Sequence, residues 1–74
     1  MTNAERADAA MIALEWHATE KDGNAPDMTI KGVLEEEMTD LLADLEHLAK
    51  REDINFDAVL RIARLHVIEE RAGR

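Results

Sequence analysis

The sequence contains no cysteine and no serine among its 74 residues, and it has one proline, three glycines, one tryptophan and one phenylalanine. Without cysteine, the chain can form neither disulfides nor thiolate metal sites. The hydroxyl groups are those of four threonines, none of which has an adjacent base that would activate it as a nucleophile. The chain starts with neither a basic leader nor an apolar run, and its apolar runs are far shorter than the roughly 20 residues that span a bilayer. We therefore expect a soluble cytoplasmic protein without a membrane segment.

The formal net charge is −8, and it is unevenly distributed. Residues 1–26 carry a net charge of −3, residues 27–54 carry −6 and residues 55–74 carry +1. An acidic surface repels phosphate backbones, so we expect no direct binding to nucleic acid. The same charge would attract a protein with a basic surface. The simpler interpretation is that the acidic residues only keep the protein soluble.

Apolar residues recur at spacings of three and four in three segments, which predicts amphipathic helices at about residues 3–21, 29–51 and 55–72. The first is rich in alanine, and we expect its single Trp16 in the core or at the edge of the core. The alternative is that Trp16 faces a binding partner. The second carries the main apolar stripe, which consists of Ile30, Leu34, Met38, Leu41, Leu45 and Leu48. The third has a stripe formed by Phe56, Leu60, Ala63 and Val67.

Capping signals precede each of these segments. Thr2 and Glu5 have the spacing of a capping box at the start of the first helix. Asp27 or Thr29 is expected to cap the second helix, and Asn55 the third. Between the first two helices, Gly23 or Asn24 can adopt the left-handed conformation that ends a helix.

A short connection at residues 52–54 predicts that the second and third helices form an antiparallel hairpin, with the first helix packed across it. The fold class is therefore all-α, in a single three-helix domain spanning residues 1–74. Leu42, Leu65 and Ile68 are apolar residues that lie outside the main stripes. Because three short helices do not need this much apolar surface, we expect a homodimer that completes a helical bundle.

The second predicted helix is also the most acidic part of the chain, and it supplies the candidate site residues. The candidate partner-binding residues are Glu35, Glu36, Glu37, Asp40 and Asp44. An alternative is a divalent metal site, for magnesium or manganese, built from Glu37, Asp40, Asp44 and His66 where the two hairpin helices face each other. A third interpretation is a solvated helix face without any ligand, which needs no cofactor.

Glu37-x-x-Asp40 resembles the second half of the Glu-x-x-Glu…Glu-x-x-Asp pattern of MazG-type all-α nucleotide pyrophosphohydrolases, and the downstream sequence LAKREDINFDAVLRIARLH looks like the closing hairpin of that family. The resemblance implies a magnesium cluster that hydrolyses nucleotides. The first half of the pattern is missing, since Glu15 and Glu20 of the first helix are five residues apart. We therefore favour a protein that is not an enzyme.

A broader resemblance covers most of residues 6–70. An Ala-rich first helix is followed by Asp-Leu-Leu-x-Asp-Leu-x-His-Leu, here residues 40–48, then by Asn55-Phe56 and by Ala-x-x-His, here residues 63–66. The pattern is similar to a group of small acidic helical proteins of phages and mobile elements. In that group a glycine commonly precedes the apolar residue of the turn, where this chain has Asp53. The resemblance implies a helical fold and a phage or mobile-element origin, without a particular activity.

These observations leave three hypotheses for function. The first is a protein–protein interaction module that binds a host or phage protein with a basic surface, for example as an inhibitor of a defence protein or a nucleic-acid-binding protein in the manner of anti-CRISPR proteins. The second is a metal-binding protein related to the MazG-type pyrophosphohydrolases. The third is a purely structural helical oligomer.

Overall fold

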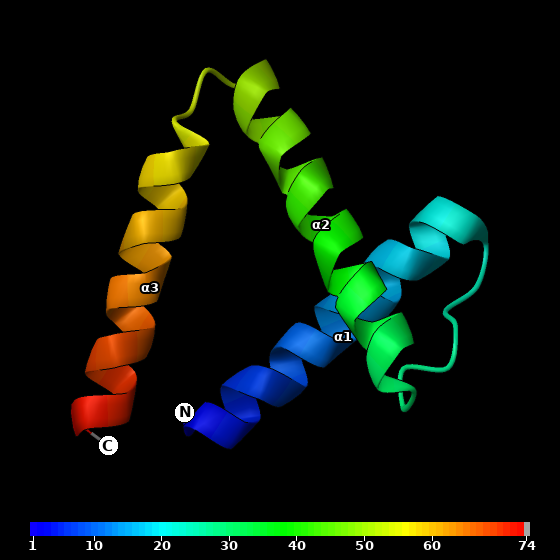
Figure 1. Ribbon diagram of the computed structural model, residues 1–74, viewed down its shortest axis with the longest axis horizontal. Helices are drawn as coiled ribbons and strands as arrows, with labels where there is room; N and C mark the ends of the chain where they lie inside the picture. The colour runs from blue at the N-terminus through cyan, green and yellow to red at the C-terminus, as the bar shows by residue number, and fades with distance from the viewer. Residues whose placement is uncertain (74) are drawn as a thin grey trace.

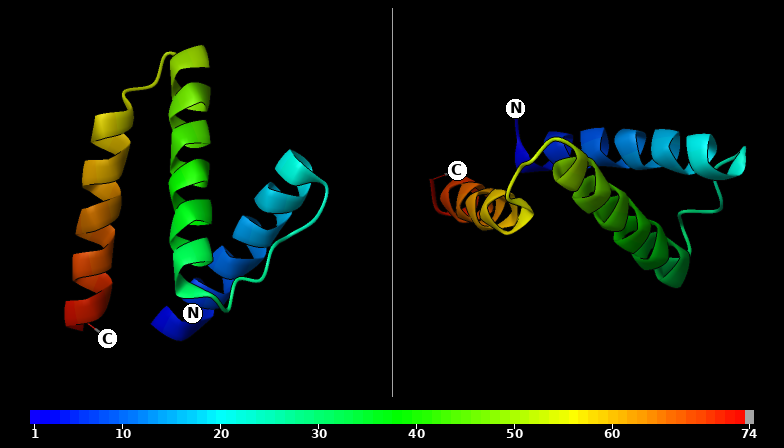
Figure 2. Two further views of the ribbon diagram at one scale, coloured as in Figure 1. Left: turned by 45° about the vertical axis from the view of Figure 1, so that its right-hand side comes forward. Right: turned by 90° about the horizontal axis from the view of Figure 1, so that it is seen from above.

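The computed structural model describes residues 1–73, with the side chains of residues 1–71. The protein is all-α, as the sequence predicts, with helices α1 (Asn3–Asp22), α2 (Lys31–Arg51) and α3 (Phe56–Gly73) and no strand among these residues (Figure 1). α2 and α3 form the expected antiparallel hairpin, and α1 crosses the first half of α2 (Figure 1, Figure 2). No helix in the described part of the chain combines the length and the apolar character that a bilayer crossing requires.

Both ends of α1 follow the sequence prediction. The Glu5 backbone N–H donates to the Thr2 hydroxyl at 3.1 Å, and the Thr2 backbone N–H donates to the Glu5 carboxylate at 2.8 Å, which completes the capping box. At the other end, Gly23 has a φ of 90° and donates its N–H to the Thr19 carbonyl at 2.8 Å. Glycine suits this left-handed position because it has no Cβ to clash with the backbone.

The predicted cap of α2 is wrong. The helix begins at Lys31 after Ile30, whose side chain makes no capping hydrogen bond. The carboxylate of Asp27 instead accepts hydrogen bonds from the backbone N–H and the hydroxyl of Thr29, the former at 3.0 Å. Because this local turn uses both polar side chains, neither reaches the first N–H groups of α2.

The turn between α2 and α3 is held by backbone hydrogen bonds. The Ile54 N–H donates to the Ala49 carbonyl at 2.8 Å and the Asp53 N–H donates to the Lys50 carbonyl at 3.3 Å, the pair of bonds that defines a Schellman motif. Asp53 takes the left-handed position, with a φ of 57°. The Asn55 carboxamide oxygen then accepts from the Ala58 N–H at 3.1 Å, so the predicted cap of α3 is confirmed.

The core lies where α1 crosses α2. Leu14 and Ala18 of α1 are buried together with Met28 of the connecting loop, and Ala18 is completely inaccessible. The partly buried residues packed against them are Met11, Leu34 and Leu41. A residue as small as alanine at the centre of the crossing allows the two helix axes to approach closely.

The apolar stripes of α2 and α3 are less buried than the sequence predicts. Met38, Leu45 and Leu48 of α2 are exposed, as is Ile30 directly before the helix. No residue of α3 is buried among residues 56–71, and Val67 of its predicted stripe is exposed. The reason is geometric: α3 leaves the turn at an angle to α2, and the two helices diverge (Figure 1). At its far end α3 is tied to the start of α1 by an ion pair between Arg6 and Glu70, at 3.3 Å.

Candidate functional site

A polar cluster joins α1 to α2 beside the core. Its centre is the Lys21 ammonium near the end of α1, with Nζ at 2.7 Å from Asp22 Oδ2, 3.2 Å from Asp40 Oδ2 and 3.3 Å from Glu37 Oε1. The hydrogen bond to Asp22 has the largest effect on the pKa of Lys21 and raises it above its ordinary value, and Asp40 and Glu37 raise it further. The ammonium is therefore held in its charged form by three carboxylates.

Glu37 is the one charged residue that is buried within the described chain, with 5% of its surface exposed. It lies on the side of α2 that faces α1, which removes its carboxylate from water. The contact between Lys21 and Glu37 Oε1 lacks the alignment of a hydrogen bond, and no other group of the described residues donates to that oxygen. The buried charge is therefore compensated by the ammonium but not fully hydrogen-bonded, which is an unfavourable state for a carboxylate in the interior.

One turn beyond Asp40 on α2, Asp44 meets His17 of α1. The distance between His17 Nε2 and Asp44 Oδ2 is 2.7 Å, and the other ring nitrogen of His17 is buried without a hydrogen-bond partner among the described residues. The sequence analysis did not identify Lys21 or His17 as site residues. The spacing of these residues could have indicated the pairing. His17 and Lys21 are four residues apart on α1, and Asp40 and Asp44 are four residues apart on α2. Residues four apart share a helix face, so the two pairs can meet across the junction.

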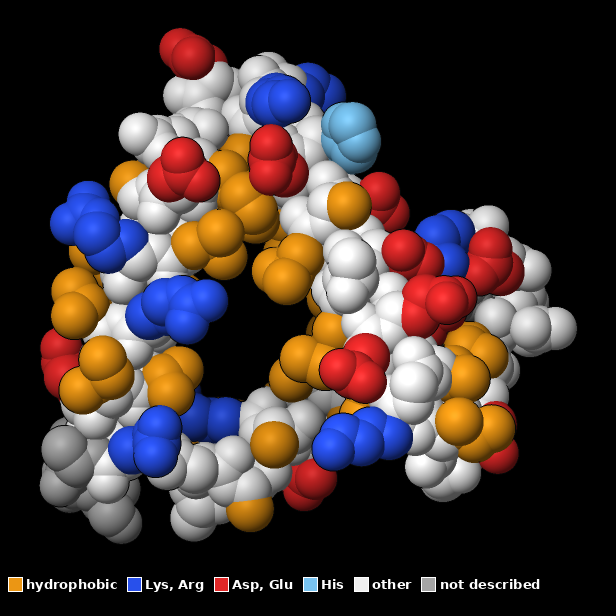
Figure 3. All heavy atoms as spheres, viewed as in Figure 1, with side chains coloured by type: hydrophobic (Ala, Val, Ile, Leu, Met, Phe, Trp, Pro, Cys, Tyr) orange, Lys and Arg blue, Asp and Glu red, His pale blue; other side chains and the backbone are white. Residues whose placement is uncertain are grey.

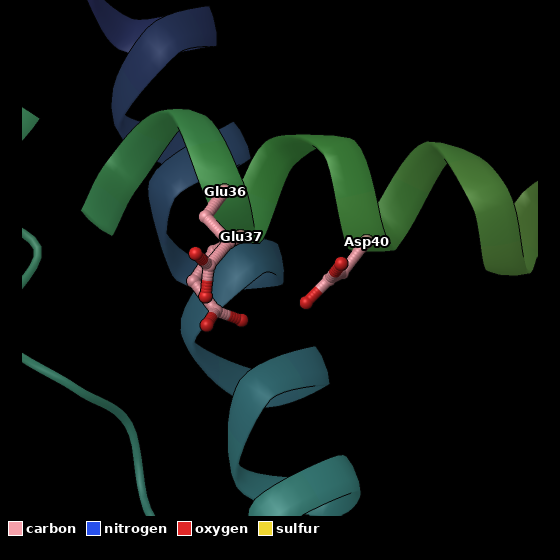
Figure 4. Close-up of side chains that lie close together, drawn as sticks. All are labelled: Glu36, Glu37 and Asp40. Carbon is pink, nitrogen blue, oxygen red and sulfur yellow. The ribbon is translucent and has the colours of Figure 1, made fainter. Parts of the chain in front are cut away.

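The structure brings together part of the predicted metal set. Ligand oxygens of Glu36, Glu37 and Asp40 lie within 4.8 Å of one another (Figure 4). Asp44 is paired with His17 instead, and His66 lines a groove on α3 with Ile62 and Ala63, outside this group.

The donor set fits a metal ion poorly. Two of its three carboxylates, Glu37 and Asp40, already contact the Lys21 ammonium, which supplies the positive charge that a divalent ion would bring. A cation entering here would have to displace a charged amine held by hydrogen bonds. We therefore assign this cluster a structural role in fastening α1 to α2.

The five predicted partner-binding residues fall into two groups. Glu37, Asp40 and Asp44 are engaged with side chains of α1, as described above. Glu35 and Glu36 are exposed, and neither forms an ion pair with any residue whose side chain the structure describes. In Figure 3, acidic side chains gather where α1 and α2 cross, whereas basic side chains are more frequent along α3.

Trp16 is not in the core, contrary to the sequence prediction. It is 66% exposed and lines a shallow groove on α1 with Ile12, Glu15 and Thr19. The core stripe of α1 is the neighbouring one, which contains Leu14 and Ala18, and this rotation of the helix turns Trp16 towards solvent. The chain therefore presents its single indole ring beside acidic residues on its outer surface.

Comparison of the chain with protein-family models, with curated proteins and with solved structures finds no match. The resemblances to phage proteins and to MazG-type enzymes therefore stay predictions. The function has to be inferred from the geometry, exposure and charge of this chain's own residues.

Proposed function

We propose that this protein is a non-enzymatic interaction module that binds a protein with a basic surface through the acidic side of α1 and α2. The observation that carries the proposal is the separation of charge: net charges of −3 and −6 fall on residues 1–26 and 27–54, against +1 on residues 55–74. Glu35 and Glu36 support it further, because they are exposed and lack cationic partners within the described residues. Such carboxylates are available to the lysines and arginines of another protein.

Trp16 supplies a candidate anchor for that interaction. Tryptophan is the residue type most enriched among those that dominate binding energy, and an exposed indole attracts a lysine or arginine cation to its face. Glu15 lines the same groove, and Glu20 lies one helical turn from Trp16. An aromatic ring flanked by carboxylates therefore suits a basic side chain rather than an acidic one.

The class of partner follows from this chemistry. Protein surfaces rich in lysine and arginine are commonly those that hold nucleic-acid phosphates. An acidic module that covers such a surface would compete with the nucleic acid, so the expected consequence of binding is inhibition of a nucleic-acid-binding protein. No catalytic step is assigned. Among the described residues, the threonine hydroxyl that meets a carboxylate is that of Thr29, which forms a local turn with Asp27, and the carboxylate cluster is neutralised in part by Lys21.

The test is a charge reversal with a matched control. Three proteins are immobilised and incubated with host lysate: the wild type, the Glu35→Lys/Glu36→Lys variant and, as the control, the Glu46→Lys/Glu52→Lys variant. The proteins that bind to each are identified by mass spectrometry. Both variants change the charge equally, and the control loses only exposed ion pairs to Lys50 and Arg51, which contribute little to stability. We expect a basic protein to bind the wild type and the control but not Glu35→Lys/Glu36→Lys, with equal helical content by circular dichroism. Equal capture by all three would contradict the proposal.

The metal-binding alternative has its own measurement. A ligand that binds the folded state raises the melting temperature in proportion to its occupancy. We expect millimolar magnesium or manganese to leave the melting temperature of the wild type unchanged, because Lys21 already neutralises the cluster. A clear increase that disappears in Asp40→Asn would favour a metal site at Glu36, Glu37 and Asp40 instead.

A further inference from the structure

The single chain exposes more surface than a compact protein of its size. Its accessible surface is 6060 Å², whereas a folded monomer of 8.3 kDa exposes about 4,600 Å², so roughly 1,500 Å² is in excess. The radius of gyration is 13.7 Å, compared with about 11 Å for a compact chain of this length. The excess is visible as an opening in the middle of Figure 3, bordered mainly by hydrophobic side chains.

α3 accounts for much of this excess. The large apolar side chains that it exposes are Val59, Ile62, Leu65, Val67 and Ile68. Contiguous exposed apolar surface of this extent is normally covered by another element or another chain. Here α3 contacts α2 near the turn and α1 through the ion pair of Glu70, and it contributes no buried residue among residues 56–71.

α2 also has an exposed apolar face. Met38, Leu42 and Leu45 follow one another at spacings of four and three, and all three are exposed. These residues share one face of the helix, beside the face that packs against α1. The stripe ends at Ala49, which is buried under the turn, so it runs directly into the hairpin with α3.

The borders of the two bare faces carry opposite charges. On α3, Arg64 and Arg71 line an open groove with the apolar side chains of Leu60 and Val67. On α2, Glu35 lies three residues before Met38 and therefore borders the apolar stripe. Surfaces of this kind are complementary when α3 of one molecule lies against α2 of another.

We propose that a second copy of this chain covers these faces, and that the protein is a two-fold symmetric dimer with α2 and α3 of both copies forming a four-helix bundle. If each copy buries its excess of roughly 1,500 Å², the interface covers about 3,000 Å² in total, which lies within the range of obligate homodimers. A two-fold axis places the same apolar faces on both sides of the interface. This inference does not rest on the proposed function: the apolar faces carry it, with Glu35 at their border, and it leaves Trp16 and the cluster of Lys21, Glu37 and Asp40 outside the interface.

The test compares two isoleucines that are both exposed in the single chain. Ile62 lies on α3 within the interface, and Ile12 lies on the outer side of α1, with exposures of 43% and 57%. Sedimentation equilibrium of the full chain should give a dimer for the wild type and for Ile12→Glu. Ile62→Glu should weaken dimerisation by at least about a hundredfold, because a carboxylate would be buried in the apolar interface.

Leu42→Glu tests the same interface from α2 and should have the same effect. Circular dichroism at matched concentrations distinguishes a folded monomer from an unfolded chain, so loss of the dimer with most of the helical signal retained supports the proposal. A wild type that stays monomeric at high micromolar concentration would overturn the proposed dimer. A monomer with a radius of gyration near about 11 Å by small-angle scattering would also overturn it, because α3 would then pack against its own chain. Equal weakening by Ile12→Glu and Ile62→Glu would also overturn it.

Discussion

The two junctions of α2 differ in a way that its sequence does not reveal. Against α1, the helix buries Leu34 and Leu41 partly, and the contact is flanked by an ion pair from Lys21 and a hydrogen bond with His17. Towards α3, an equally apolar face stays exposed. An amphipathic pattern therefore identifies the apolar side of a helix, whereas the crossing angles between helices determine which element covers that side.

Truncating one leucine at each junction should show the largest difference. Leu14→Ala removes a side chain that is 5% exposed at the α1–α2 crossing, and we expect it to lower the free energy of unfolding by about 3 kcal/mol. Leu65→Ala on α3, at 45% exposure, should lower it by less than about 1 kcal/mol. Urea denaturation followed by circular dichroism measures the two free energies of unfolding. Both substitutions are made in the Ile62→Glu background, so that association does not contribute. Equal losses would mean that the α2–α3 junction is packed as tightly as the α1–α2 crossing.

The polar half of the α1–α2 junction can be tested separately from its apolar half. Glu37→Leu replaces a buried, incompletely hydrogen-bonded carboxylate with an apolar side chain of similar size. We expect the free energy of unfolding to rise by about 1 kcal/mol, because the desolvation of the charge is removed while Lys21 keeps Asp22 and Asp40. Glu36→Leu, at an exposed neighbouring position, is the control and should change stability by less than about 0.5 kcal/mol. A strong loss of stability in Glu37→Leu would show that its ion pair contributes more than its burial costs.

The turn that leads into the open junction contains one strained residue. Asp53 has a φ of 57°, a conformation that glycine adopts without steric penalty. We expect Asp53→Gly to raise the free energy of unfolding by about 0.5 kcal/mol, since relief of the strain is partly offset by the greater freedom of glycine in the unfolded chain. Asp53→Ala keeps the Cβ, removes the carboxylate and should lower stability instead. Thermal denaturation of the three proteins at one concentration measures this order, and a loss in Asp53→Gly would contradict the assignment of strain.

Acid should weaken the α1 side of the molecule by a small amount. The backbone N–H of Thr2 lowers the pKa of Glu5 below its ordinary 4.5, and the hydroxyl of Thr29 lowers the pKa of Asp27 below its ordinary 3.8. A carboxylate with a lowered pKa in the folded state stabilises the fold above its unfolded pKa, and this contribution disappears as the pH falls through the lowered value. The melting temperature should therefore decrease as the pH falls below about 4.5. Thr2→Ala should reduce the slope of this decrease, and an unchanged slope would exclude the capping box as its source.

The sequence predicted the candidate site only in part. Glu37, Asp40 and Asp44 were expected on one side of α2, and they do lie together on the side that faces α1. Their partners, Lys21 and His17, were missed because Asp40 and Asp44 were expected to face α3 and His66, whereas they face α1. Trp16 was placed in the core although it lies on the second of two adjacent apolar stripes of α1, and the buried stripe is the other one, with Leu14 and Ala18. A helix with two adjacent apolar stripes has two possible rotations, and local spacing does not choose between them.

Local patterns specify the three helices and most of their ends. The capping box of Thr2 and Glu5, the left-handed Gly23 and the cap at Asn55 each depend on atoms a few residues apart, so the neighbouring residues are sufficient to predict them. Which apolar side chains are buried and which charges are paired depends on tertiary packing. The contact of Lys21 with Asp40 spans 19 residues and that of His17 with Asp44 spans 27. Such contacts depend on how whole helices cross, and the crossing is set by packing rather than by any local pattern.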